Sequence, residues 1–339
     1  MTSDDHLDKE TSLTAILSEN GIQAKAKSRF VSGVDRLLGN VTEIANVFLE
    51  SKTGTKRSRI EAEKLLIQAA VSTLTAEVRE DKLLAKQILE NGFSQMSRRQ
   101  LNKEKVIEAA TIELKNSPPT KENSTTGPSE LSDEFLNRFE RYSEDASEDE
   151  VRAKWAKVLA AEIKSPGQFS AKVMRTLDEI DNQTATLFTN AASHRIGSSI
   201  PKALYNPAYT AQRALDEAGL IKQSITNIIQ LGVKVTDNAG NEFWLVQFGK
   251  IAISFHDNDL QELISKANRS DLISWSEKDQ TIGIVILGST AIATSIMEIL
   301  DDNSLGNCKA LVAEFRKSKF KTSIYSLDPV TNNWIKTAY

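Results

Sequence analysis

The chain of 339 residues is long enough for about two domains of ordinary size. Its 42 Lys and Arg residues against 46 Asp and Glu residues give a formal net charge of −4, which excludes a strongly basic nucleic-acid binder that works through its overall field. A content of 40% hydrophobic and 26% charged residues excludes a highly charged disordered chain.

The single cysteine and the apolar runs indicate the compartment in which the protein works. Cys308 is the one cysteine, so neither an internal disulfide nor a thiolate zinc site can form within one copy. The first residues are acidic and polar, unlike a secretory signal, and the apolar run over residues 282–287 is far too short to cross a bilayer. We therefore expect a cytoplasmic protein with no membrane span.

The first third of the chain has the pattern of amphipathic helices. From Phe30 to Phe48, apolar residues recur at every third or fourth position. Residues 60–91 contain neither Pro nor Gly, and residues 102–114 repeat apolar side chains at a spacing of four. We predict an N-terminal helical domain over residues 1–115, whose apolar stripes must pack on each other or on a partner.

A polar segment follows this helical region. Residues 116–129, NSPPTKENSTTGPS, hold three of the seven prolines and no large apolar residue. Proline ends helices, and Ser, Thr and Gly add chain freedom, so we predict a flexible linker over 116–129. A long ordered surface loop is the alternative.

The remainder predicts a helical core over residues 130–200 and an α+β part over 201–339. In the latter, β-type runs over 233–235 and 242–255 flank turn residues 237–241, which favours a hairpin. The predicted fold class is therefore mainly α: an N-terminal helical region, a linker, and a helical core followed by a small winged-helix-like α+β part.

Residues equipped for catalysis are scarce. His6, His194 and His256 stand apart from one another and from any pattern of metal ligands. No phosphate-binding glycine motif and no nucleophile elbow occurs, and Cys308 has no histidine near it in sequence. We expect no catalytic residue, no cofactor and no metal, and we lean towards a protein that is not an enzyme.

Two basic clusters are candidates for nucleic-acid binding, because clustered Lys and Arg side chains neutralise phosphates. Acidic residues are interleaved with them in this region, so a solvated helical face is the competing interpretation. The clusters consist of Lys52, Lys56, Arg57 and Arg59, and of Arg98, Arg99, Lys103 and Lys105.

The most distinctive motif spans residues 155–170, WAKVLAAEIKSPGQFS. With DRLLG at 35–39 and RQLNKEKV at 99–106, it resembles an uncharacterised bacterial domain-of-unknown-function family. The core motif of that family is W-A-K-x-L-A-x-E-I-x-x-P-G-x-F-S. The resemblance extends to about residue 230. It implies no catalytic residues and points to a role in bacterial antiviral defence.

The motif can also be read without the family, as a helical corner with an aromatic plug. Trp155 and Leu159 lie on one face of a helix, and Glu162 is directed elsewhere. The tight turn that follows then lets the ring of Phe169 fold back. A packing role is favoured over a ligand role, since no strong nucleophile or metal ligand is present. The residues concerned are Trp155, Leu159, Pro166, Gly167 and Phe169.

Three functional hypotheses follow. The leading one is a non-enzymatic interaction or scaffold protein that self-associates as a homo-oligomer, or binds a protein partner, through its amphipathic N-terminal helices. The second is a nucleic-acid-binding regulator that uses the basic clusters. The third is a defence enzyme whose active site is assembled from residues distant in sequence.

Overall fold

The computed structural model describes residues 24–38, 82–119, 127–222, 228–237, 240–256, 260–268, 272–328 and 330–337. The chain divides into two compact units, Met1–Met174 and Arg175–Tyr339. Helix α9 (Ala171–Glu179) runs across this division.

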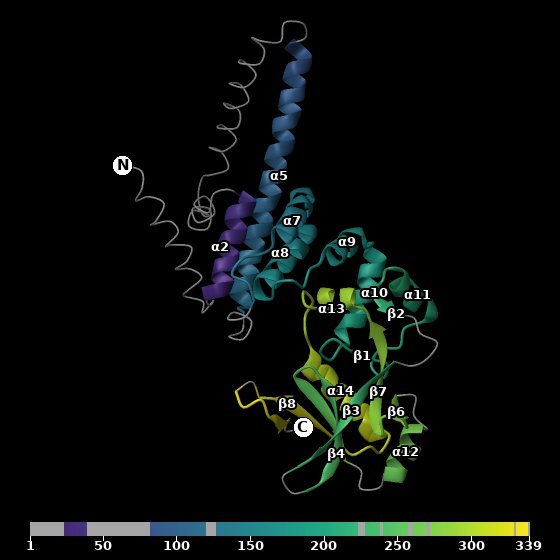
Figure 1. Ribbon diagram of the computed structural model, residues 1–339. Helices are drawn as coiled ribbons and strands as arrows, with labels where there is room; N and C mark the ends of the chain where they lie inside the picture. The colour runs from purple at the N-terminus through teal and green to yellow at the C-terminus, as the bar shows by residue number, and fades with distance from the viewer. Residues whose placement is uncertain are drawn as a thin grey trace. The chain divides into compact units, whose positions relative to one another are not determined.

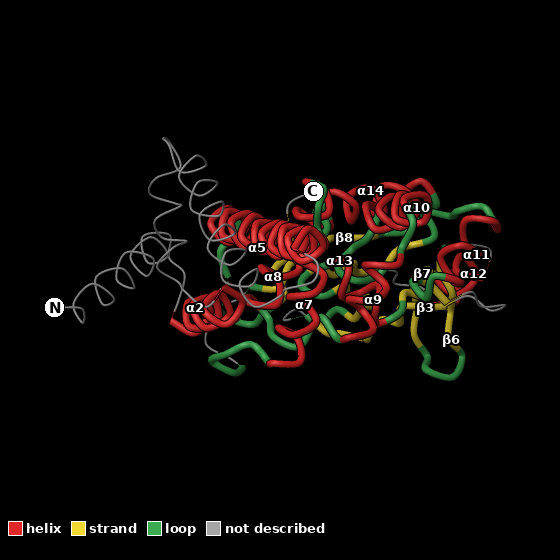
Figure 2. The backbone as a smooth tube through the Cα atoms, turned by 90° about the horizontal axis from the view of Figure 1, so that it is seen from above, coloured by secondary structure: helices red, strands yellow, loops and turns green. Residues whose placement is uncertain are grey.

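In the described part of the first unit, the main helices are α2 (Ala24–Leu38), α5 (Lys82–Asn116), α7 (Asp133–Asp145) and α8 (Asp149–Lys164). Each of the four contacts the other three, and they lie side by side when viewed from above (Figure 2). Their apolar stripes meet in a core whose largest fully buried side chains include Phe30, Phe139 and Trp155. Helix α5 is 35 residues long and extends well beyond α7 and α8 (Figure 1).

The predicted segments 1–115 and 130–200 both supply helices to this unit. Helix α5 packs on α7 and α8, which follow the predicted linker. Within that linker, residues 120–126 lie outside the described residues. The carbonyl of Pro128 accepts a hydrogen bond of 2.7 Å from Nε of Arg29, which attaches the end of the segment to α2.

The second unit contains the helices α10 (Asn182–Ser193), α11 (Tyr209–Glu217), α12 (Leu260–Asn268), α13 (Ala291–Met297) and α14 (Ser304–Lys317). Side chains cap two of them as their sequences require: Asp181 accepts from the amide of Thr184, and Thr290 accepts from the amide of Ala293.

The same unit contains a curled antiparallel sheet of nine strands, which forms a half-barrel. Its central path runs in the order β1-β7-β3-β4-β5-β8-β9, and β2 and β6 also pair with β7. The strands are β1 (Ile200–Pro201), β2 (Ile221–Lys222), β3 (Ile228–Thr236), β4 (Glu242–Phe248), β5 (Ile251–Phe255), β6 (Ile273–Ser276), β7 (Thr281–Ser289), β8 (Thr322–Leu327) and β9 (Trp334–Thr337).

The predicted fold class, mainly α with a small winged-helix-like part, is wrong because of this sheet. The predicted hairpin does form, since Val233 lies opposite Leu245 across β3 and β4. It is the middle of a much larger sheet, in which β3 also pairs with β7, where Ile228 lies opposite Ile286. Pairing between strands so distant in sequence leaves no local signal in the sequence. The run over 242–255 is itself two strands, separated by a tight turn at Gly249 (φ +64°).

Two glycines of β7 permit the close packing inside this sheet. A Cβ atom at Gly283 would lie 2.1 Å from Cγ2 of Ile229, and one at Gly288 would lie 2.2 Å from Cδ1 of Ile228. No larger residue fits at either position without displacing a β3 side chain.

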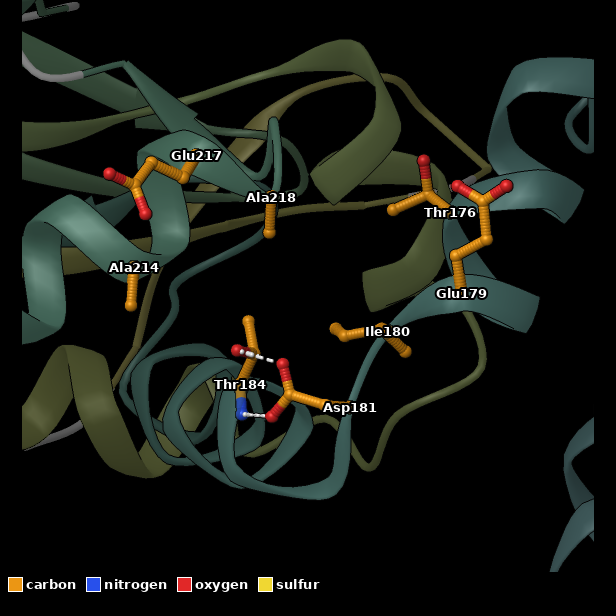
Figure 3. Close-up of a pocket in the computed structure, with 8 residues that line it drawn as sticks. All are labelled: Thr176, Glu179, Ile180, Asp181, Thr184, Ala214, Glu217 and Ala218. Atoms are coloured by element: carbon orange, nitrogen blue, oxygen red, sulfur yellow. Dashed lines mark hydrogen bonds between the residues drawn. The ribbon is translucent and has the colours of Figure 1, made fainter.

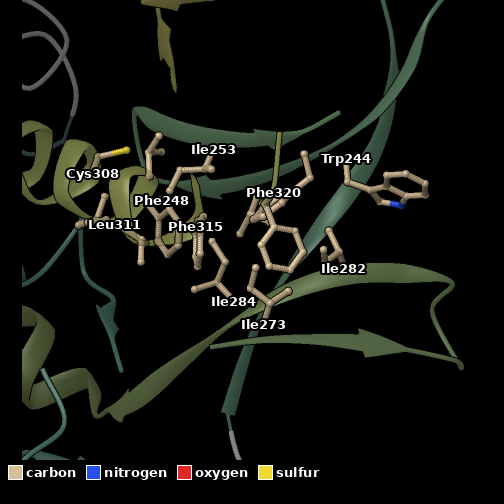
Figure 4. Packing of buried hydrophobic residues seen from close by; sticks show 14 of the residues in the cluster. Trp244, Phe248, Ile253, Ile273, Ile282, Ile284, Cys308, Leu311, Phe315 and Phe320 are labelled. Atoms are coloured by element: carbon tan, nitrogen blue, oxygen red, sulfur yellow. The ribbon is translucent and has the colours of Figure 1, made fainter. Parts of the chain in front are cut away.

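The core of the second unit lies between the sheet and α14. Helix α14 contributes Cys308, Leu311 and Phe315, which meet Ile253 and Phe320 and the isoleucines of β6 and β7 (Figure 4). The rings of Phe255, Phe315 and Phe320 contact one another with centroids 5.4 to 6.3 Å apart. This aliphatic and aromatic core holds the sheet in its curled form.

Candidate interaction surface on helix α5

Helix α5 has one face that packs in the four-helix core and that continues beyond it. Lys103, Val106, Ala110 and Leu114 recur at spacings of three or four residues, and all are buried. The same spacing, continued towards the N-terminus, leads to Arg99 and Met96. Met96 is 68% exposed, so the packing face of α5 extends past its described partners.

The structure separates the predicted basic cluster of α5. Arg98, Arg99 and Lys105 are exposed, whereas Lys103 points into the helical core. The ammonium Nζ of Lys103 lies 2.8 Å from Oε1 of Glu140 and 3.4 Å from Oε1 of Glu144. It also donates to the carbonyl of Leu37 at 3.2 Å. Lys103 therefore joins α2, α5 and α7, and its charge is already compensated within the protein.

The other predicted basic cluster, Lys52, Lys56, Arg57 and Arg59, lies outside the described residues.

We expect Lys103→Ala to lower the free energy of unfolding of the first unit by about 2–4 kcal/mol, because it leaves two part-buried carboxylates without their cation. Arg98→Ala removes an exposed side chain and should change the free energy of unfolding by no more than about 0.5 kcal/mol. Urea denaturation followed by hydrogen exchange of the α7 and α8 amides compares the two variants. Equal stabilities would show that the Lys103 ion pairs contribute nothing.

The stretch of α5 that leads into the core has a distinct charge. Residues 91–103, NGFSQMSRRQLNK, contain no acidic residue. Arg98 and Arg99 are exposed there together with Met96 and Leu101. Met96 and Arg99, three residues apart, share the continued packing face, and we call these two residues the α5 surface; Arg98 and Leu101 lie on the other side of the helix. The α5 surface combines an apolar side chain with a guanidinium group, which suits an acidic partner that also presents apolar side chains.

The tryptophan motif packs as a helical corner. Trp155 is 1% exposed, stacks on Tyr142 with ring centroids 4.6 Å apart, and meets Phe139 edge-on at 6.2 Å. Leu159 and Phe169 of the same motif are also buried. The turn between them contains Pro166 and Gly167, whose φ of +91° suits glycine.

Glu162 holds this corner together, and the sequence interpretation that directed it elsewhere is wrong. Its buried carboxylate accepts hydrogen bonds from the amides of Gly167 at 2.5 Å and Phe169 at 3.0 Å. Burial raises the pKa of Glu162, while these backbone N–H groups and the charge of Arg29 act in the opposite direction. The sequence carried the signal, because Glu162 lies seven residues after Trp155 on the same helical face.

Buried Arg29 is the cationic partner of this corner. Its guanidinium donates through Nη1 to the carbonyl of Ile163 at 3.0 Å, near the end of α8. Burial lowers the pKa of Arg29, and the charge of Glu162 opposes that shift. A pocket of 210 Å³ lies next to the corner, and its lining includes Arg138, Glu162 and Ser170.

A larger pocket, of 360 Å³, lies in the second unit between α11 and the corner that joins α9 to α10 (Figure 3). Two of the acidic side chains that line it, Asp181 and Glu217, have partners. Asp181 accepts from the amide of Thr184 at 2.8 Å and from its hydroxyl at 2.7 Å, and these bonds lower the pKa of Asp181. Glu217 accepts from Arg213 at 2.8 Å. The lining residues are Thr176, Glu179, Ile180, Asp181, Thr184, Ala214, Glu217 and Ala218.

The remaining reactive side chains are occupied or buried. His194 stacks on Tyr205, and Nε2 of His256 lies 2.6 Å from Oγ of Ser254, a fully buried serine. Burial raises the pKa of the Cys308 thiol to about 12, so almost no thiolate forms near neutral pH. His6 lies outside the described part of the chain.

Two searches of the described residues gave negative results. They contain no group of three or more His, Cys, Asp or Glu side chains that could hold a metal ion. Among the helices that the structure describes, none combines the length and the apolar character needed to cross a membrane.

Comparisons with known proteins give one match. Searches of curated proteins and of solved structures returned no match. Residues 90–204, from α5 to the loop after β1, match the family model described as "Protein of unknown function (DUF2806)". This segment includes the exposed Arg98 and Arg99 and the whole tryptophan corner, and it is similar to an uncharacterised domain family.

Proposed function

We propose that the protein is a non-enzymatic, cytoplasmic interaction protein that binds a protein partner, or a second copy of itself, through the α5 surface. The observation that carries this proposal is the continuation of the α5 packing face past the core, where Met96 is 68% exposed. The part of that face from Lys103 to Leu114 is buried against neighbouring helices.

The energetics favour a partner at this position. Covering an exposed Met side chain contributes about 1.5–3 kcal/mol, which is a large share of the energy of a typical hot spot. Arg99 adds a positive charge to the same face, and arginine is enriched at interface centres because its planar group pairs with carboxylates. The preferred partner surface is therefore apolar with acidic residues at its rim.

The test compares full-length proteins in which charge is reversed inside and outside the α5 surface. Light scattering from micromolar to several hundred micromolar measures self-association, and co-purification from the native host recovers partners. We expect Met96→Glu with Arg99→Glu to lower the affinity at least about tenfold, since it places carboxylates opposite acidic groups. Arg141→Glu, an exposed residue of α7, is the matched control and should change nothing.

Two results would contradict the proposal. One is a monomer at every concentration with no stoichiometric partner. The other is self-association or partner binding that is equally strong in the double variant and in the control.

Nucleic-acid binding is the second candidate, favoured by the exposed Arg98 and Arg99 in a stretch without acids. Because Lys103 is a structural residue, it must be left intact in the test. Arg98→Ala with Arg99→Ala should lower affinity for a duplex or single strand and reduce the slope of log affinity against log salt by about 2. Failure to retain DNA or RNA at low salt would exclude this candidate.

A further inference from the structure

The 360 Å³ pocket of the second unit, which we call the acidic pocket, collects negative charge from the ends of two helices. Helices α9 and α11 both end in the sequence LDE, at residues 177–179 and 215–217, and neither has a basic residue in its last turn. The ends of both helices line the pocket. Glu217 and Glu179 lie on opposite sides of it, with Asp181 below them in the view of Figure 3. Every lining residue belongs to the second unit.

Acidic residues in the last turn of a helix oppose the helix dipole. The C-terminal end of a helix carries a partial negative charge, which favours Lys or Arg there and disfavours Asp or Glu. Both helices that end at the acidic pocket have the unfavourable arrangement. Natural sequences that break a local rule of this kind do so mostly at functional sites. A cationic group bound in the pocket would offset the repulsion at both helix ends.

The carboxylates of the pocket can accept further hydrogen bonds. Glu217 and its ion-pair partner Arg213 are 63% and 65% exposed, and exposed ion pairs of this kind contribute little to stability. Asp181 accepts two hydrogen bonds from Thr184, whereas a carboxylate has about four acceptor sites. Glu179 is exposed. An incoming cation can therefore pair with all three side chains.

The apolar part of the lining suits the aliphatic stem of such a cation. Ile180 and Ala218 project into the space between the carboxylates, and Ala214 lies beside them (Figure 3). Arginine combines an apolar stem with a planar guanidinium that pairs with carboxylates. A volume of 360 Å³ lies at the lower end of the range of about 300–1,000 Å³ for ligand pockets, which is room for a side chain and not for a large molecule.

We infer that the acidic pocket receives the α5 surface of a second copy of the chain, with Arg99 at the carboxylates and Met96 on the apolar lining. This inference rests on the proposed function and deepens it, because it names the partner and the receiving site. The charges of the two surfaces are complementary: residues 91–103 contain no acid, and the pocket presents three carboxylates. Each copy carries both surfaces, so two copies can make the contact twice in a two-fold dimer.

The test measures self-association of full-length chains by sedimentation at low salt, from micromolar to several hundred micromolar. The pocket variant is Glu179→Lys with Glu217→Lys, and it should weaken self-association at least about tenfold, because it places positive charge opposite Arg99. Lysine in the last turn suits the helix dipole, so the fold of this variant should be at least as stable as the original.

Asp178→Lys with Asp216→Lys is the matched control. It makes the same change of charge in the last turns of the same two helices, at exposed residues outside the pocket lining. We expect its self-association to stay within about twofold of the original. A difference between the two variants therefore reports on the pocket and not on net charge.

Mixing two variants tests whether the contact joins different copies. Arg99→Glu alone should also weaken self-association at least about tenfold. An equimolar mixture of this chain with the pocket variant should associate again, because each α5 surface then meets a pocket of opposite charge on the other chain. A contact made within one copy would leave the mixture as monomeric as its components.

Three results would overturn the inference: a monomer of the original chain at every concentration, equal effects of the pocket variant and its control, or a mixture that does not associate. If Met96→Glu with Arg99→Glu weakens association while the pocket variant behaves like its control, the α5 surface stands and the acidic pocket is not its partner. If the double variant of α5 has no effect either, the proposed function fails as well.

Discussion

Replacing Trp155 by alanine is expected to lower the free energy of unfolding of the first unit by about 3–5 kcal/mol. The indole is 1% exposed and contacts both Phe139 and Tyr142, so the substitution removes a large buried side chain and two ring contacts together. Urea denaturation followed by hydrogen exchange of the α7 and α8 amides measures the loss. Tryptophan fluorescence is unsuitable, because the three tryptophans left in the variant, at positions 244, 275 and 334, lie in the second unit and report on that unit. Hydrogen exchange of the α7 and α8 amides reports on the first unit directly.

Trp155→Phe is the matched control, since it keeps an aromatic ring and leaves a smaller cavity. We expect it to cost less than the alanine variant. A loss below about 1 kcal/mol for Trp155→Ala would mean that the corner does not organise the helical core.

The second large effect is expected at Glu162. Glu162→Ala should destabilise the first unit by about 2–4 kcal/mol, because it leaves the buried amide of Phe169 without an acceptor and Arg29 without its counter-charge. Glu162→Gln keeps one acceptor oxygen and should cost less. The same denaturation and exchange measurement applies, and an alanine variant as stable as the glutamine variant would contradict the role assigned to these hydrogen bonds.

Glu162 also predicts the sign of one pH dependence. Its pKa in the folded protein is raised above the ordinary value of 4.5, so the folded state holds this proton more tightly than the unfolded state. Stability from this group is therefore present at low pH and is lost as the pH rises from 4.5 through the raised pKa. The stability of Glu162→Gln relative to the original protein should improve over that window. A difference that does not change with pH would show that the two states bind this proton equally.

The helices were more predictable than the sheet because their signals are local. The apolar spacing around Phe135, Phe139 and Trp155 identifies α7 and α8, and the same side chains form the core. The nine-stranded sheet depends on pairs such as Ile228 with Ile286, which lie far apart in sequence and carry no local signature. Very short strands such as β1 and β2 have too few residues to show a period.

The candidate site was predictable in part for the same reason. The sequence identifies Arg98, Arg99, Lys103 and Lys105 as a basic cluster, but charge alone does not show which side chains turn inwards. Lys103 lies on the same helix face as Val106 and Ala110, and this position predicts that Lys103 is buried. A buried lysine is tolerated only if acidic partners on other helices compensate its charge. Glu162 of α8 is likewise a charged residue that lies on a buried helix face.

The central claim is that Met96 and Arg99 of α5 lie on a binding surface, and hydrogen exchange of the amides of residues 92–101 tests it most directly. The measurement compares the full-length protein in its assembled form with the Met96→Glu, Arg99→Glu variant at the same concentration. The account predicts slower exchange of these amides in the assembly and faster exchange in the variant. Equal exchange in both, with the assembly intact, would place the contact elsewhere and contradict the claim.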